Sequence, residues 1–161
     1  MLVTKPAPNF EADAVMPDNS FKKVSLSDYK GKKIVLFFYP LDFTFVWPTE
    51  LLAFDHRISE FESRNTQVLG CSIDSHFSHL RWKEMEVNKG GIGNIQYPLV
   101  ADIDKSIARK YDVLLGSEPA TVYTPERLTQ PKSSVKAWNR TKSRSNWISH
   151  FAVKFTLGLE K

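Results

Sequence analysis

Apolar residues fall along this chain in short blocks separated by amphipathic stretches. Residues 34–39, 68–73 and 97–101 are largely apolar and of strand length, which is typical of strands in the interior of a sheet. Residues 49–64 predict an amphipathic helix instead, because one stripe collects most of its apolar side chains: Leu51, Leu52, Phe54, Ile58 and Phe61.

Two further helices are predicted from capping residues. Asp74 or Ser75 can cap a helix that runs to about Met85, and Asp104 can cap another over residues 105–111. Repeated strand–helix–strand units imply right-handed crossovers and a sheet covered on both faces, so the predicted fold class is α/β.

Composition fits one domain of ordinary size. The chain has 161 residues, of which 42% are hydrophobic and 12% aromatic, values typical of a globular domain. The longest apolar run, residues 34–39, is far shorter than the roughly 20 residues of a membrane span. Residues 1–6 lack the apolar region of a secretory signal, so a cytoplasmic location and no membrane partner are expected.

Sulfur chemistry is limited to one cysteine, Cys71, which excludes a disulfide within the chain. Cys71 lies in the apolar segment 67–73. We interpret it as a buried, inert residue that packs like a small apolar side chain, in preference to a reactive thiol.

The segment 40–50 carries the most specific pattern. An apolar strand leads through Pro40 into a short loop with Thr44, and Pro48 suits the first turn of a following helix. Position 47 then lies at a helix N-terminus, where the dipole and free amides favour an anion. This arrangement resembles the active-site turn of a peroxiredoxin, Pro-x-x-x-Thr-x-x-Cys, except that position 47 is Trp47.

Other motifs agree with this resemblance in order and spacing. The chain is similar to the alkyl hydroperoxide reductase C or typical 2-Cys branch over residues 1–118. The resemblance implies a thioredoxin-like α/β fold, and besides the active-site turn it rests on residues 5–10, 69–75, 89–93 and 98–102.

The resemblance also implies a chemistry. A peroxidatic thiolate at position 47 would reduce hydrogen peroxide and organic hydroperoxides, and a second thiol would resolve its sulfenic acid. Thr44 would hydrogen-bond the thiolate and peroxide, Pro40 would shield the pocket from water, and Glu50 would join an anion-stabilising network with an Arg. The implied partners are a thioredoxin-like or flavoprotein disulfide reductase and further copies in a homodimer or ring. Neither a cofactor nor a metal is implied.

Trp47 removes the nucleophile from this scheme. Indole has one N–H donor, no accessible anion at neutral pH and no oxidisable sulfur, and its bulk would fill the peroxide pocket or open the first helical turn. We therefore expect a catalytically inactive chain. One alternative is that Trp47 is an apolar anchor in a chain that never needed the thiol; another is a non-catalytic oligomerising or chaperone-like subunit, since residues 43–46 lie beside the family's dimer–dimer contact.

After Glu118 the resemblance stops, and no residue is in register with the family's active-site Arg; Arg127 is near but out of register. Charge changes at the same point: residues 1–116 hold 14 Lys and Arg against 15 Asp and Glu, and residues 117–161 hold 8 against 3. We therefore predict a peroxiredoxin domain over residues 1–118 and a basic divergent part over 119–161.

Two interpretations of residues 119–161 remain open. The favoured one is a foreign tail, from a frameshift, an alternative transcript or a retained intron. The other is a divergent but folded C-terminal half, supported by an alternation typical of a half-buried strand: Phe151, Val153, Phe155, Leu157 and Leu159.

Two more patterns have simpler explanations. His76 and His79 could suit a metal on a helix, but no further cluster completes a site, so a solvated first turn is the better interpretation. The basic segment with Trp138 and Trp147 could suggest nucleic acid. A solvated basic segment explains it more simply, and no nucleic-acid partner is expected.

Overall fold

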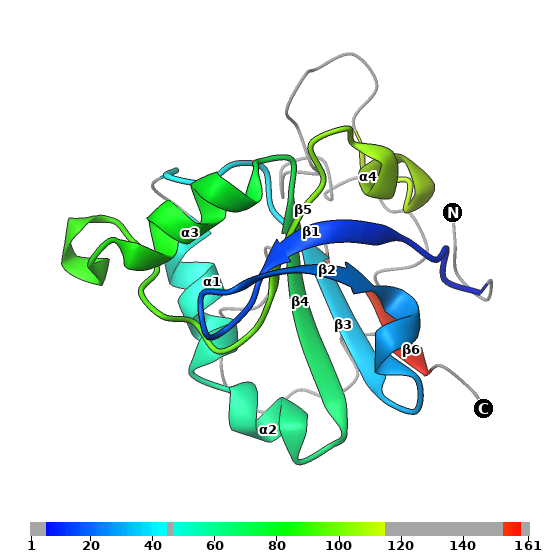
Figure 1. The fold of residues 1–161 in the computed structure, drawn as a ribbon. Helices are drawn as coiled ribbons and strands as arrows, with labels where there is room; N and C mark the ends of the chain where they lie inside the picture. The colour runs from blue at the N-terminus through cyan, green and yellow to red at the C-terminus, as the bar shows by residue number, and fades with distance from the viewer. Residues whose placement is uncertain (1–5, 45–46, 115–152, 159–161) are drawn as a thin grey trace, which may run out of the picture.

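A computed structural model describes residues 6–44, 47–114 and 153–158, with Trp47 and residues 153–158 described by their backbone. Figure 1 shows a central sheet with helices on its two sides. In chain order the elements are β1 (Glu11–Val15), β2 (Phe21–Ser25), the 3-10 helix η1 (Leu26–Tyr29), β3 (Lys33–Phe38), α1 (Trp47–Asp55), α2 (Ile58–Glu62), β4 (Thr66–Ser72), α3 (His76–Glu84), the 3-10 helix η2 (Val87–Lys89), β5 (Leu99–Ala101), α4 (Ser106–Lys110) and β6 (Val153–Gly158).

The described strands form one mixed sheet in the order β2-β1-β5-β4-β3-β6. The three predicted interior strands are confirmed as its parallel centre, because β3 pairs with β4 and β4 with β5 in parallel. The outer pairings of β1 with β2, β1 with β5 and β3 with β6 are antiparallel. The α/β class and the thioredoxin-like fold are therefore confirmed.

Alternate residues of the central strands build a core on each face. In β4, Leu69 and Cys71 contribute to one face and Val68 to the other, as the two-residue period of a strand requires. The first face packs against α4 through Ile107 and Ala108. The second packs against α1, α2 and α3, which lie on the opposite side of the sheet (Figure 1), through a set of side chains that includes Phe37, Tyr39, Leu51, Phe54 and Trp82.

The single helix predicted over residues 49–64 is wrong. The structure has two helices, α1 and α2, because Arg57 has a non-helical ψ of 13° and ends the regular hydrogen bonding. Ile58 and Phe61 of α2 still pack against the same core cluster as Phe54 of α1. The apolar stripe therefore continues across the break between α1 and α2, and the periodicity of the sequence could not reveal that break.

Helix α4 also begins differently from the prediction. Its first residue is Ser106, preceded by Lys105 with a left-handed φ of 60°. The buried carboxylate of Asp102 accepts the amides of Ile107 and Ala108 at 2.9 and 2.7 Å, while Asp104 accepts that of Ser106 at 3.0 Å. Asp102 therefore shares the capping of α4 with Asp104, which was the only cap predicted from the sequence.

The hairpin of β1 and β2 was not predicted from the sequence pattern. Its strands are five residues each and present charged side chains outward, so few positions show the apolar alternation: Ala14, Val15 and Val24 are the fully buried ones. The alternation near the C-terminus, by contrast, did predict a strand. Residues 153–158 of that alternation form β6, which pairs with β3, and the choice between the two interpretations of residues 119–161 stays a prediction.

Candidate functional site

The candidate site lies where β3 ends and the chain turns into α1. Pro40 and Thr44 are half-buried in the connecting loop, and Trp47 is the first residue of α1. Phe43 adopts a left-handed φ of 58°, a conformation in which a bulky residue is an outlier. The structure thus confirms that position 47 begins a helix, while the indole of Trp47 and residues 45 and 46 lie outside its described part.

Thr44 closes the loop on itself. Its hydroxyl donates a hydrogen bond of 2.9 Å to the carbonyl oxygen of Leu41. A hydroxyl carries one proton and two acceptor lone pairs. Thr44 must therefore rotate before it can donate to an anion or a peroxide at position 47, which is the role that the resemblance implies for it.

Glu50 lies in the first turn of α1, where a carboxylate is favoured by the helix dipole. Its Oε2 atom is buried and has no hydrogen-bond partner among the residues that the structure describes. Burial raises the pKa of Glu50 from 4.5 to about 7, because the charged form loses solvation. Glu50 is thus an acid that can hold or release a proton near neutral pH.

A buried polar network that the sequence reading missed lies under the loop. The side chains of Asp42 and His79 are almost completely buried, and Asp42 Oδ2 lies 2.8 Å from His79 Nδ1. The Tyr39 hydroxyl donates to Asp42 Oδ1 at 3.0 Å, and His79 Nε2 lies 3.3 Å from the carbonyl oxygen of Val100. This network joins the site loop, helix α3 and strand β5.

A second bond fixes the same loop from the other side. The Asp42 amide donates to Asp74 Oδ2 at 2.8 Å, and the Ser72 hydroxyl donates to the same oxygen at 3.0 Å. The Asp74 side chain therefore binds the loop and does not cap α3. Ser75 caps α3 instead, because its hydroxyl accepts a hydrogen bond of 3.2 Å from the Ser78 amide. The one signal in the sequence was that a charged residue, Asp42, interrupts an otherwise apolar stretch.

His76 and His79 make separate contacts in the structure. His79 is held by the network just described, whereas His76 contacts the rings of Phe21 and Phe77. The described part of the chain contains no group of three or more His, Cys, Asp or Glu side chains that could hold a metal ion.

Cys71 cannot take over at position 47. It is fully buried in β4, and burial raises the pKa of its thiol well above the ordinary value. Its side chain belongs to the core face covered by α4, whereas Leu51 of α1 packs on the other face of the sheet. The predicted burial of Cys71 is confirmed, and its inertness stays a prediction.

The remaining predicted features of the site fall in undescribed segments. Arg127, Trp138 and Trp147 lie within residues 115–152, outside the described part of the structure.

No helix among the described residues is both long and apolar enough to cross a membrane.

Comparisons with known proteins agree with this architecture. The model of the AhpC/TSA family matches residues 3–128. The mitochondrial thioredoxin-dependent peroxide reductase of Drosophila melanogaster is 58% identical over 116 residues, which cover 72% of this chain and 49% of that protein. A chloroplastic 2-Cys peroxiredoxin of Arabidopsis thaliana is 57% identical over 118 residues, 73% of this chain and 44% of that protein. The chain thus spans about half the length of these curated relatives.

Solved structures give the same result. The reduced 2-Cys peroxiredoxin of Plasmodium vivax superposes with a TM-score of 0.71 at 50% identity, over 73% of each chain. The AhpC structure of Enterococcus faecalis superposes with a TM-score of 0.65 at 36% identity, over 71% of this chain and 66% of that one.

Proposed function

The chain belongs to the AhpC/TSA family of peroxiredoxins, and on that premise we propose that it is a peroxidase scaffold for hydrogen peroxide and organic hydroperoxides whose nucleophile position is occupied by Trp47. One observation carries the proposal: the residue that opens α1, where a peroxidatic thiol would stand, is Trp47. In this proposal the chain keeps the family's site for hydroperoxides but does not reduce them catalytically.

The neighbouring groups have roles in the same proposal. Pro40 limits water at the site, Thr44 can hydrogen-bond an oxygen ligand after rotation, and Glu50 contributes a carboxyl group that changes charge near neutral pH. A thiolate at position 47 would attack the terminal peroxide oxygen, forming a sulfenic acid and releasing water or an alcohol. The lone pair of the indole nitrogen belongs to its aromatic system and cannot make this displacement, so no sulfenic acid forms at position 47.

A turnover assay tests this function. The wild-type chain, supplied with a large excess of hydrogen peroxide and a thioredoxin reducing system, should show no more multiple-turnover peroxide consumption than a heat-denatured sample. Cys71→Ser should behave like the wild type, because Cys71 is buried on the other face of the sheet. Activity that disappears in Cys71→Ser would overturn the proposal, since it would make Cys71 the nucleophile.

A second candidate function is a non-catalytic oligomerising or chaperone-like subunit. Phe43 and Phe77 favour it, because they are 47% and 64% exposed, and Phe21, 44% exposed, lies 5.4 Å from Phe77 between ring centroids. Exposed apolar groups of this kind mark interaction surfaces. Suppression of aggregation of a heated client protein should weaken in Phe43→Ser and Phe77→Ser if this function holds.

We also propose partners and a location for the chain, on the basis of its family. The Drosophila relative is thioredoxin-dependent by its name, so we propose a thioredoxin-like or flavoprotein disulfide reductase as the partner of a chain with Cys restored at position 47. We also propose assembly into a homodimer or ring. Relatives have mitochondrial and chloroplastic names, and cytoplasmic location remains a proposal for this chain.

A further inference from the structure

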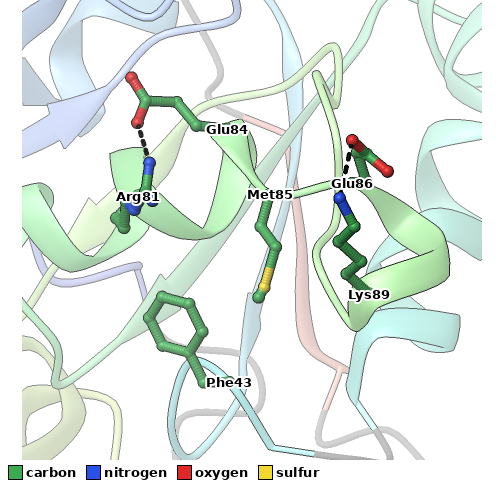
Figure 2. A pocket seen from close by; sticks show the side chains of 6 residues that line it. All are labelled: Phe43, Arg81, Glu84, Met85, Glu86 and Lys89. Carbon is green, nitrogen blue, oxygen red and sulfur yellow. Dashed lines mark hydrogen bonds and ion pairs between the residues drawn. The ribbon is translucent and has the colours of Figure 1, made fainter.

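A pocket of about 360 Å³ lies between the site loop and the C-terminal end of α3. Its lining comes from one loop residue and from the end of α3 with the adjoining η2: Phe43, Arg81, Glu84, Met85, Glu86 and Lys89. Figure 2 shows these side chains around a common space, with Met85 between the two charged pairs. A volume of this size falls in the range of small-molecule sites.

Met85 supplies the reactive atom of this pocket. It is half-buried, and in Figure 2 its thioether extends toward the ring of Phe43. Gly91 packs so tightly against the backbone of Met85 that a Cβ atom there would collide with it. The backbone of Met85 is therefore closely packed at the point where its side chain leaves for the pocket.

Cationic donors lie on both sides of Met85. Arg81 Nη1 donates to Glu84 Oε2 at 3.2 Å, and Lys89 Nζ donates to Glu86 Oε1 at 3.1 Å. A guanidinium has five N–H donors and an ammonium three, so each of these contacts uses one donor of several. The pocket therefore combines a thioether with N–H groups that can bind an oxygen-containing ligand.

We propose that this pocket is a modification site, in which a hydroperoxide oxidises Met85 to methionine sulfoxide. A sulfur lone pair attacks the terminal peroxide oxygen, the S–O bond forms and the O–O bond breaks. The sulfur loses two electrons, and the peroxide is reduced. The proton of the terminal hydroxyl passes to the departing oxygen, which leaves as water or an alcohol, while Arg81 and Lys89 stabilise its developing charge.

This reaction goes beyond the proposed function, because it needs no group at position 47 and consumes one peroxide per Met85. It also changes the protein, since a sulfoxide is polar and disrupts apolar packing. The neighbouring contact is that of Phe43 with Trp82, whose ring centroids are 5.8 Å apart. Oxidation of Met85 should therefore loosen the packing of the site loop on α3.

Met16 provides the internal control. It is also half-buried, but it packs against the core cluster on the α4 side of the sheet and does not line the pocket. The native chain would be pulsed with hydrogen peroxide or cumene hydroperoxide, and added oxygen on Met85 and Met16 measured by peptide mass spectrometry. The same pulse in concentrated urea gives the intrinsic ratio of the two rates.

The ratio of Met85 to Met16 oxidation should be at least about fivefold higher in the native chain than in urea. A native ratio equal to or below the ratio in urea would overturn the proposal. Arg81→Gln should slow Met85 oxidation about twofold or more, whereas Lys22→Gln, which changes an exposed Lys outside the pocket, should not. Equal rates in these two variants would overturn the role assigned to Arg81.

Discussion

At the scale of single residues, Glu50 makes the stability of the fold depend on pH. Its pKa is raised from 4.5 to about 7 by burial, so the folded state binds its proton more tightly than the unfolded state. This contribution to the free energy of unfolding is fully present below pH 4.5 and is lost as pH rises to about 7.

Glu50→Gln should therefore flatten the decrease in stability between pH 4.5 and 7 and should be more stable than the wild type at the upper end. Urea unfolding across this range measures the effect. Glu62→Gln is the matched control, because Glu62 is exposed on α2 and should leave the slope unchanged. A Glu50→Gln variant with the slope of the wild type would contradict the assigned cause.

Asp42 makes a second prediction at this scale. Its carboxylate holds both the buried His79 and the Tyr39 hydroxyl, so Asp42→Ala should lower the free energy of unfolding by about 3 kcal/mol. Asp13→Ala removes a surface pair with Lys23 of 3.5 Å and should change stability by less than about 0.5 kcal/mol. Equal losses in the two variants would show that the buried network contributes no more than a surface pair.

At the scale of elements, helix α3 positions both His79 of the network and Arg81 of the pocket. Its start depends on Ser75, whose hydroxyl accepts the Ser78 amide. Ser75→Ala should destabilise the chain by about 1 kcal/mol, measured by thermal or urea unfolding. Ser59→Ala, at an exposed position inside α2, should be neutral or slightly stabilising. If Ser75→Ala left the free energy of unfolding unchanged, packing alone would determine where α3 begins.

The strands in the sheet centre could be predicted from sequence because they are buried on both faces and therefore continuously apolar. The break between α1 and α2 could not, because it leaves the apolar stripe intact on both sides of Arg57. Position 47 at a helix start was predictable from Pro48. The contact between Asp42 and His79 was not, because it joins residues 37 positions apart and no local pattern records it.

At the scale of the whole molecule, we propose that a peroxiredoxin domain over residues 1–118 is followed by a basic divergent part, while the family model itself matches residues 3–128. Residues 117–161 hold 8 Lys and Arg against 3 Asp and Glu, and the strand within them pairs with β3. We expect limited proteolysis to cut first between residues 117 and 147, where the composition is richest in polar and basic residues. Protection of that stretch equal to that of β3 would show that it packs like the core.

We propose that the strand, loop and helix start of a peroxiredoxin site surround position 47, where Trp47 replaces the nucleophile. Trp47→Cys tests it most directly, because the helix start should lower the pKa of the new thiol below about 8.5. After a short peroxide pulse, mass spectrometry should find oxygen added to Cys at position 47 as sulfenic or sulfinic acid, with no disulfide inside the chain, and none of this in the wild type. A revertant whose new thiol reacts no faster than a free cysteine, or a wild type that turns over peroxide, would contradict the account.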